Sequence, residues 1–357
     1  MSQLKVNTIR HTGASSDAVT LASDGTCTAK ITNYPHRNLV INGGFDIWQR
    51  ATDSGSNTDN GVLAADRWYL GSSGATKQVT RQAFTLGQTD VPGYPTYYLR
   101  YAVTTGNNNC ALRQYIEDVR KVQGEVTLSF WAKGTNPNGG NFDLIQRQDF
   151  GTGGSPSSVV DTSIGTLTVT GSWVRYKYTF TPPSIAGKTI GTDANSSMYK
   201  LEIFRQPDGD ASTNAYTIDI ANVQLEYGNT ATDFEHRSYG DELARCHRYY
   251  YKHIAGNNLV VCLGFSSATN QVSGYIQFPT TMRATPSIDH TSGDNYYRLG
   301  AGNLGGDKYV DGAWALQGAT DQSTRIYATP QSTLTAGEPG LVDTTSASAS
   351  MAFSAEL

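Results

Sequence analysis

The sequence predicts an all-β protein with an extended N-terminal arm, a jelly-roll β-sandwich, a short helix and a second, C-terminal β-sandwich domain. Three observations predict this class. Charged residues make up 16% of the 357 residues, and the chain contains 37 glycines and 21 tyrosines. A surface solvated by hydroxyl and amide groups suits short strands and tight turns. Many short segments alternate apolar with polar residues, whereas helix signals are scarce.

The charge and cysteine patterns exclude several classes of partner. The formal net charge is -4 and no long run of Lys or Arg occurs, so we expect no nucleic-acid partner. No stretch approaches 18 apolar residues, and the start lacks the apolar run of a signal peptide. We therefore expect that the protein is made in the cytoplasm and does not insert into a membrane. The four cysteines form no CxxC spacing, so we expect them to be reduced and mostly buried.

Residues 1–36 are predicted to form a docking arm. Isolated apolar side chains lie there among Ser, Thr, Gly and Asp, namely Leu4, Val6, Ile9, Val19 and Leu21. Such a segment has too little apolar surface to pack on itself. It is therefore either disordered or ordered by another chain.

Residues 37–238 are predicted to form the sandwich. The segments "TYYLRYAVT", "GEVTLSFWAKG", "WVRYKYTFT", "MYKLEIFR" and "YTIDIANVQLE" alternate apolar with polar residues and are separated by Gly, Pro, Asn and Ser clusters. This spacing fits an antiparallel sandwich or jelly roll.

A short connecting helix is predicted over residues 239–246, because Ser238 precedes Asp241 by three residues, as in a capping box. Residues 247–357 then form the C-terminal β domain, and its first strand is expected over 247–254. Tyr249 and Tyr251 are expected on one face of that strand and Tyr250 on the other. His247 and His253 are too far apart in either a helix or a strand to share a metal.

The sequence gives little support to catalysis or to cofactor binding. "GAGNLG", at residues 300–305, matches a dinucleotide motif, but no helix pattern follows it, so we interpret it as a hairpin loop. "PPSIAGKTIG" lacks the first glycine of a phosphate loop and is interpreted as a turn. Neither HExxH nor GxSxG occurs. We expect a protein that is not an enzyme and has no organic cofactor.

Aromatic residues offer flat faces on which sugars could stack if their rings are exposed. Trp68, Tyr98 and Tyr115 are the candidates for sugar contact. Trp131 in "LSFWAKG" and Trp173 in "GSWVRY" are interpreted as sandwich core, and Trp314 also carries a flat ring.

An ordered set of motifs carries a resemblance to a known family. The set begins with "NLVINGGFDIWQR" and "ADRWYL", continues through "LRQYIEDV", "VTLSFWAKG", "WVRYKYTFTPP" and "IDIANVQLEYG", and ends with "FEHRSYGDELARCHRYY". Over roughly residues 38–251, the chain resembles bacteriophage virion appendage proteins that contain a carbohydrate-binding-module-like jelly roll. The arm "LKVNTI…TLASDG" resembles the start of structural proteins of marine phages, especially those of cyanobacteria. "IQFPTTMRATPSI" resembles the C-terminal β domain of such proteins.

The resemblance implies a non-enzymatic, trimeric component of the virion. Its arm would bind other virion proteins of the tail or head, and its C-terminal domain would form the distal tip. In this family, a structural Ca²⁺ often lies between the "NGGFE" strand start and an acidic residue on the last strand. The equivalents here are Asn42, Asp46 and Asp219. Asp46 replaces the family's Glu, and its side chain is one methylene shorter. The shorter side chain counts against the site, because calcium needs six to eight oxygen ligands at close range.

Three functions stay open at this point. The chain is expected to be a tail fibre or appendage that takes part in host attachment, with a host-surface glycan as a candidate ligand. The first alternative is a decoration or knob protein bound to the capsid. The second is a lectin or depolymerase that acts on surface polysaccharide, for which paired carboxylates need not be close in sequence.

Overall fold

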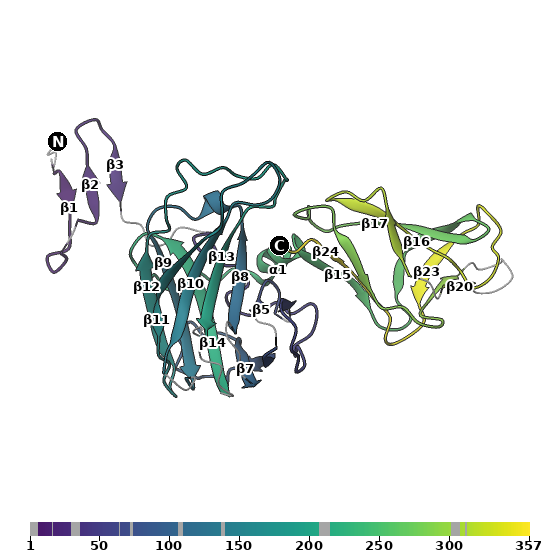
Figure 1. The fold of residues 1–357 in the computed structure, drawn as a ribbon, viewed down its shortest axis with the longest axis horizontal. Coiled ribbons are helices and arrows are strands. Elements are labelled where there is room, and N and C mark those ends of the chain that lie inside the picture. Colours follow the sequence, from purple (N-terminus) through teal and green to yellow (C-terminus); the bar gives the residue numbers. More distant parts are fainter. Residues whose placement is uncertain are drawn as a thin grey trace, which may run out of the picture.

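A computed structural model describes residues 6–15, 17–29, 36–63, 65–71, 74–105, 110–136, 140–206, 215–300, 308–310 and 313–357. The all-β prediction is confirmed: within these ranges the regular structure is β-strand, apart from one α-helix and one 3-10 turn. Figure 1 shows the arm at one end, the sandwich in the middle and the C-terminal sheets at the other end. None of the described helices is long and apolar enough to cross a membrane.

The arm is a small antiparallel sheet. Its strands are β1 (Thr8–Ile9), β2 (Val19–Leu21) and β3 (Cys27–Ala29), in the order β1-β2-β3. No described side chain of residues 6–27 is buried. Ile9 is 56% exposed, and Val6 and Leu21 are 38% and 40% exposed. Leu4 lies outside the described residues. Residues 6–15 and 17–27 of the arm thus include strands but contribute no buried side chain to a core.

Two antiparallel sheets form the sandwich. The six-stranded sheet has the order β11-β10-β13-β8-β5-β4 and the five-stranded sheet the order β12-β9-β14-β7-β6. The strands of the first are β4 (Val62–Leu63), β5 (Tyr69–Gly71), β8 (Ala111–Glu117), β10 (Phe142–Asp149), β11 (Val160–Leu167) and β13 (Met198–Arg205); those of the second are β6 (Thr76–Ala83), β7 (Tyr97–Thr105), β9 (Val126–Gly134), β12 (Val174–Phe180) and β14 (Tyr216–Tyr227). From β7 to β14 the chain crosses repeatedly between the sheets, as a jelly roll does.

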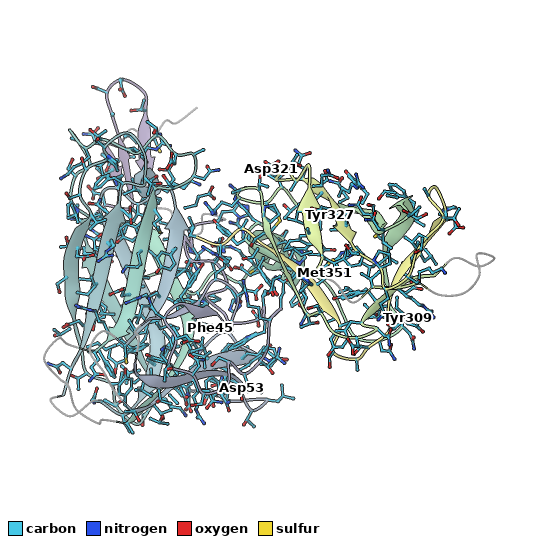
Figure 2. The ribbon with its side chains drawn as sticks, turned by 45° about the vertical axis from the view of Figure 1, so that its right-hand side comes forward. Phe45, Asp53, Tyr309, Asp321, Tyr327 and Met351 are labelled. Carbon is cyan, nitrogen blue, oxygen red and sulfur yellow. The ribbon has the colours of Figure 1, made fainter. Side chains whose placement is uncertain are left out.

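Inward-facing residues of both sheets make one apolar core. On β9, Leu128 and Phe130 point inward, and they pack with residues such as Leu201 of β13 and Ile218 of β14. Phe45, from the segment before the first sandwich strand, is also fully buried (Figure 2). The alternate residues of each strand point away from this core, so each sheet presents an outer face.

The predicted connecting helix is confirmed. Helix α1 spans Tyr239–His247, and the Ser238 hydroxyl accepts a hydrogen bond of 3.1 Å from the backbone N–H of Asp241. Cys246 is the buried residue of this helix. The strand that follows, β15, spans Tyr250–Ala255 and therefore begins three residues later than predicted. A backbone hydrogen bond from the Tyr249 N–H to the Cys246 carbonyl continues the helical turn and delays the strand.

The tyrosines after the helix contact different parts of the protein. The Arg50 guanidinium lies 3.5 Å from the ring centroid of Tyr250, whereas the Tyr251 ring stacks on Phe353 in the C-terminal core. Tyr250 and Tyr251 thus point to opposite sides, as predicted. The expectation that Tyr249 shares the side of Tyr251 is wrong, because its ring lies under the Arg67 guanidinium of the sandwich, at 3.5 Å.

The C-terminal region contains two further sheets around a second core. The three-stranded sheet has the order β15-β24-β18, and the seven-stranded sheet has the order β20-β19-β23-β16-β17-β22-β21. The added strands are β16 (Val260–Ala268), β17 (Gln271–Gln277), β18 (Ser287–His290), β19 (Tyr297–Gly300), β20 (Lys308–Val310), β21 (Ala315–Gln317), β22 (Ser323–Ala328), β23 (Pro339–Thr344) and β24 (Ser350–Ser354). Met351 lies in this core (Figure 2). Strands β19 and β20 pair antiparallel, and most of "GAGNLG", residues 301–305, lies outside the described residues.

The end of the chain is held against the sandwich. The Glu356 carboxylate pairs with Arg67 and accepts a 3.0 Å hydrogen bond from the Tyr69 hydroxyl. A second contact is a bidentate pair in which Arg248 donates to both oxygens of Glu117, at 2.7 and 3.0 Å. Figure 1 shows the C-terminus beside α1, between the sandwich and the C-terminal sheets. We call these two contacts the seam.

Candidate functional site

A cluster of rings lies on the outer face of the five-stranded sheet. Tyr98 of β7 and Trp131 of β9 point away from the core, while Phe84 and Trp173 lie next to the ends of β6 and β12. All four side chains are partly exposed. We call Phe84, Tyr98, Trp131 and Trp173 the aromatic face.

Three of these rings contact one another directly. The ring centroids of Phe84 and Tyr98 are 4.8 Å apart, and Trp173 lies 5.4 Å from each of them, edge-on to Tyr98. Such spacings are those of favourable aromatic pairs. The contacts fix the ring orientations and leave part of each ring open to solvent.

Charged side chains form a row beside the rings. The strand register places Lys133 opposite Asp219, and Asp219 opposite Arg100. Arg100 donates hydrogen bonds of 2.7 and 2.9 Å to the two oxygens of Asp219, which is 4% exposed. The Lys133 ammonium lies 3.9 Å from Asp219 and 5.1 Å from the Trp173 ring centroid. The aromatic face therefore borders a fixed row of hydrogen-bonding groups.

The pKa values of Tyr98 and Arg100 are both shifted by their position beside the buried Asp219 side chain. Burial and the nearby Asp219 carboxylate raise the pKa of the Tyr98 hydroxyl. The hydrogen bond with Asp219 raises the pKa of Arg100. Tyr98 thus stays a neutral hydroxyl, and Arg100 stays a cation, at every ordinary pH.

A hollow adjoins the aromatic face at Phe84. It has a volume of about 300 Å³ and is lined by residues 83–88 and 94–97. Tyr94 in its wall is 82% exposed. Flat rings beside a groove, with hydroxyl, guanidinium and ammonium groups within reach, can bind a sugar by stacking and by hydrogen bonds to its hydroxyls.

The structure separates the aromatic residues that the sequence had grouped as sugar contacts. Tyr98 lies in the aromatic face, and Tyr115 lies on the outer face of the other sheet. The expectation for Trp68 is wrong, because it is 1% exposed and its indole N–H donates to the Asn42 carbonyl at 3.0 Å. Trp314 is likewise buried, at 2% exposed.

The core assignment of Trp131 and Trp173 is also wrong. The signal lies in "LSFWAKG": Leu128 and Phe130 have one parity along the strand, whereas Trp131 has the parity of Lys133. A ring that alternates with the apolar residues belongs to the outer face. Trp173 stands one residue before β12, where the parity of the strand gives no guidance.

The three residues expected to bind calcium do not fit that role in this arrangement. The Asn42 side chain is fully buried and makes three hydrogen bonds to the backbone of Ile47 and Asp66. Both oxygens of Asp219 accept from Arg100. Partial burial and the Glu242 carboxylate raise the pKa of Asp46. Across the described ranges, no group of three or more His, Cys, Asp or Glu residues is placed to hold a metal ion.

The acidic groups near Asp46 are neutralised by a guanidinium. Arg237 is 6% exposed at its side chain and lies 3.1 Å from Glu235 and 3.2 Å from Glu242. It also donates to the Val40 carbonyl at 3.2 Å. This buried Arg237 supplies a positive charge in the neighbourhood where the calcium was expected.

The cysteine and histidines near the helix are packing residues. The rings of His247 and His253 lie 5.1 and 5.5 Å from the Tyr251 ring. Burial lowers the pKa of both histidines, so both are neutral at pH 7. Burial also raises the pKa of the Cys246 thiol, which is therefore protonated and unreactive.

Comparison with known proteins gives matches among solved structures only. No family model matches the chain, and no curated protein matches it. A putative sugar-binding protein from Bacteroides thetaiotaomicron is 12% identical over 54% of this chain and 100% of that chain, with a TM-score of 0.31. The enzymatically active domain of tailspike protein 4 from bacteriophage CBA120 is 17% identical over 54% of this chain, with a TM-score of 0.28.

This chain spans only 22% of the tailspike chain. A third structure, described as a CBM4 structure, is 18% identical over 52% of this chain and 97% of that chain, with a TM-score of 0.26. Identities and TM-scores of this size assign no ligand, activity or partner to this chain. Its function has to be argued from its own residues.

Proposed function

We propose that this chain is a non-enzymatic appendage protein of a bacteriophage particle and that its aromatic face binds a polysaccharide on the host surface. The observation that carries the sugar-binding part is the contact of Phe84, Tyr98 and Trp173 beside the fixed Asp219–Arg100 pair. Stacking on such rings contributes about 1 kcal/mol each, and the Arg100 guanidinium, which Asp219 holds in place, can donate hydrogen bonds to sugar hydroxyls.

The arm supports the appendage part of the proposal. Its strands are two or three residues long, and an isolated sheet of this size is marginally stable in water. Ile9 and Leu21 are exposed, and none of the described side chains of residues 6–27 is buried. We propose that another virion protein covers Val6, Ile9, Val19 and Leu21 in the assembled particle.

We also propose that the appendage is a homotrimer. An apolar strip on the outer face of the seven-stranded sheet supports self-association, because Leu263 is 79% exposed and lies opposite Leu341 in the register. Phe265 and Tyr275, on β16 and β17, are also exposed, at 42% and 59%. Mass determination by light scattering tests this: Leu263→Glu should convert trimers into monomers without unfolding the chain.

The proposal is tested on particles. Phage that lack the gene should lose an appendage in electron micrographs and should adsorb poorly to host cells. Phage that carry Tyr98→Ala with Trp173→Ala should keep the appendage and lose adsorption. Tyr239→Ala is the matched control, because this tyrosine is 63% exposed on α1 and does not line the hollow at Phe84. Intact morphology without the gene would refute the appendage, and normal adsorption of the double variant would refute the sugar face.

The same particles separate the alternatives. A capsid decoration should be present in many more copies per particle than a tail fibre, which quantitative mass spectrometry measures. A depolymerase should shorten the host polysaccharide, whereas the proposed binding protein should leave its chain length unchanged.

A further inference from the structure

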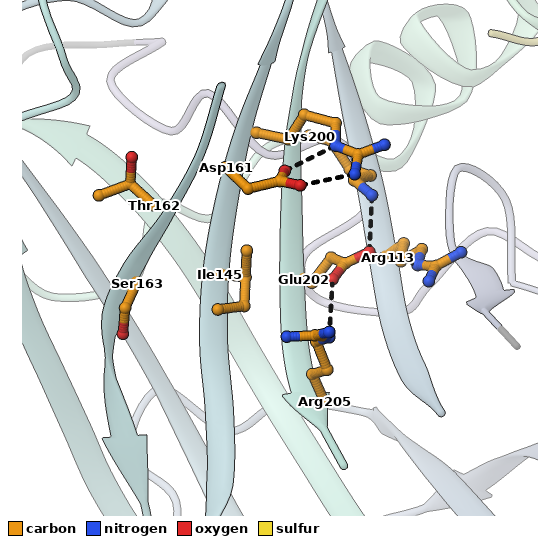
Figure 3. A pocket seen from close by; sticks show the side chains of 9 residues that line it. Arg113, Ile145, Asp161, Thr162, Ser163, Lys200, Glu202 and Arg205 are labelled. Atoms are coloured by element: carbon orange, nitrogen blue, oxygen red, sulfur yellow. Dashed lines mark hydrogen bonds and ion pairs between the residues drawn. The ribbon is translucent and has the colours of Figure 1, made fainter. Parts of the chain in front are cut away.

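A second hollow lies on the outer face of the six-stranded sheet, on the opposite side of the sandwich from the aromatic face. Its volume is about 430 Å³, which is within the range of small-molecule pockets of roughly 300–1,000 Å³. Strands β8, β10, β11 and β13 supply its walls (Figure 3). It is lined by Arg113, Ile145, Arg147, Asp161, Thr162, Ser163, Lys200, Glu202 and Arg205.

The strand register explains how these side chains come together. Lys200 lies between Arg147 on β10 and Tyr115 on β8. In the neighbouring row, Glu202 lies between Ile145 and Arg113. Since all of these residues have the outward parity of their strands, they form two adjacent rows on one surface.

One buried carboxylate organises the floor of the hollow. Glu202 is 4% exposed, and its Oε1 atom lies 2.6 Å from Arg113 Nε and 2.7 Å from Lys200 Nζ. Arg205 Nε is 3.7 Å from the other oxygen. Figure 3 shows these cations converging on Glu202. The side chains of Lys200 and Arg113 are only 8% and 14% exposed, so both cations have lost most of their water.

The backbone makes room for this arrangement at Gly71. A Cβ atom at that position would lie 2.3 Å from the Arg113 Cζ, so no larger residue could occupy it unless the guanidinium moved. Arg113 is therefore held against the β5 backbone, where its Nη1 also donates to the Asn60 side chain at 3.3 Å.

Positive charge exceeds negative charge in the hollow. Its lining contains four cationic residues and two acidic ones, a difference of two. At the rim, Arg147 and Asp161 neutralise each other through two hydrogen bonds of 2.6 Å. Burial lowers the pKa of Lys200, the Glu202 carboxylate opposes this, and the nearby Arg113 and Arg147 lower it further. An anion that entered the hollow would therefore relieve repulsion among cations that are already in place.

We propose that this hollow binds the carboxylate or sulfate group of an acidic saccharide. Tyr115 lies beside Lys200 in the register, so its partly buried ring borders the hollow at β8, and the Ser163 hydroxyl, opposite Ile145 on the outward side of β11, provides a further hydrogen-bonding group. The site does not depend on the aromatic face, which lies on the other sheet.

Calorimetric titration of the full chain with a trimeric oligouronate tests the proposal. Arg147→Gln should weaken binding about fivefold, and Asp161→Asn should strengthen it by a similar factor, because one charge near a partly exposed site contributes roughly 1 kcal/mol. Both residues lie at the rim, with side chains 36% and 48% exposed, so both variants should fold. Arg120→Gln is the matched control, since this arginine is 65% exposed and lies outside the hollow.

Each outcome decides the matter. Opposite effects of the two rim variants, with no effect of Arg120→Gln, would support the site. No binding of the oligouronate, or equal losses in Arg147→Gln and Arg120→Gln, would overturn it. Titration with inorganic sulfate at equal ionic strength distinguishes a saccharide site from a simple anion site. If sulfate binds as tightly as the oligouronate, the hollow is a simple anion site and the saccharide proposal fails. Tyr98→Ala with Trp173→Ala should leave the titration unchanged.

Discussion

Asn42 is predicted to be a structural residue whose loss destabilises the sandwich strongly. Its side chain donates to the carbonyls of Ile47 and Asp66 at 2.8 and 3.0 Å, and it accepts from the Ile47 N–H at 3.0 Å. Asn42→Ala would leave the Asp66 carbonyl and the Ile47 N–H without these partners and would remove one of two hydrogen bonds to the Ile47 carbonyl, which keeps the Asp66 N–H at 3.2 Å. Each of the three lost hydrogen bonds costs about 1 kcal/mol. The backbone φ of 58° adds about 1 kcal/mol, because alanine tolerates the left-handed region less well than asparagine. The expected loss is about 4 kcal/mol.

Urea denaturation followed by tryptophan fluorescence measures this loss, because four of the five tryptophans, at positions 48, 68, 131 and 173, lie in the sandwich. With a slope of about 2 kcal/mol/M, the midpoint should fall by about 2 M. Asn42→Asp separates a structural role from a calcium ligand. A carboxylate there would face two carbonyl oxygens, so we expect this variant to be destabilised as well, with no rescue by Ca²⁺.

Asp46→Asn is the control, and it should change stability little, because it removes a carboxylate that Glu242 repels. An Asn42→Asp protein as stable as the wild type, or a large gain in stability on adding Ca²⁺, would refute this reasoning and restore the calcium site.

Three further predictions concern the seam and the arm. Glu356→Gln should loosen the C-terminus and speed proteolytic release of the last residues, and it should destabilise the sandwich by about 3 kcal/mol, because the buried Arg67 guanidinium loses its charged partner; unchanged proteolysis would count against the seam. Burial raises the pKa of Glu117, but its pair with Arg248 outweighs burial and lowers the pKa below the ordinary value of 4.5 for a glutamate. The stability from this pair is therefore fully present above pH 4.5 and lost as the pH falls through the lowered pKa; in Arg248→Gln, the loosening measured by hydrogen exchange at low pH should already be present at pH 7. Ile9→Ser with Leu21→Ser should leave the melting temperature of the free protein unchanged and prevent its incorporation into particles, and normal incorporation would contradict the docking role.

Short sequence patterns predicted individual strands and the helix start well. The alternation in "GEVTLSFWAKG" predicted β9, and the Ser238–Asp241 spacing predicted the start of α1. The boundary after the helix was less accurate, because "HRY" continues the helical turn before β15 begins. Strand propensity alone does not indicate where the preceding helix releases its last hydrogen bonds.

The candidate sites depend on pairings that a single sequence does not reveal. Phe84, Tyr98 and Trp173 come from separate segments and meet only through the order β12-β9-β14-β7-β6. The sequence also did not indicate that Trp68 is buried and Trp173 partly exposed. Each of these tryptophans stands one residue before a strand, where the alternation of the strand does not determine which way the ring points. Residues Asn42 and Asp219 are both buried and polar, as ligands often are, but each satisfies its oxygens with protein donors.

Sugar binding by the aromatic face is tested most directly by affinity electrophoresis of the full chain through gels that contain purified host surface polysaccharide. The wild-type protein should be retarded, and Tyr98→Ala with Trp173→Ala should bind at least about tenfold more weakly, because two stacking rings are lost. Tyr239→Ala should migrate like the wild type. Equal retardation of the double variant and the wild type, or free migration of the wild type, would contradict the proposed function.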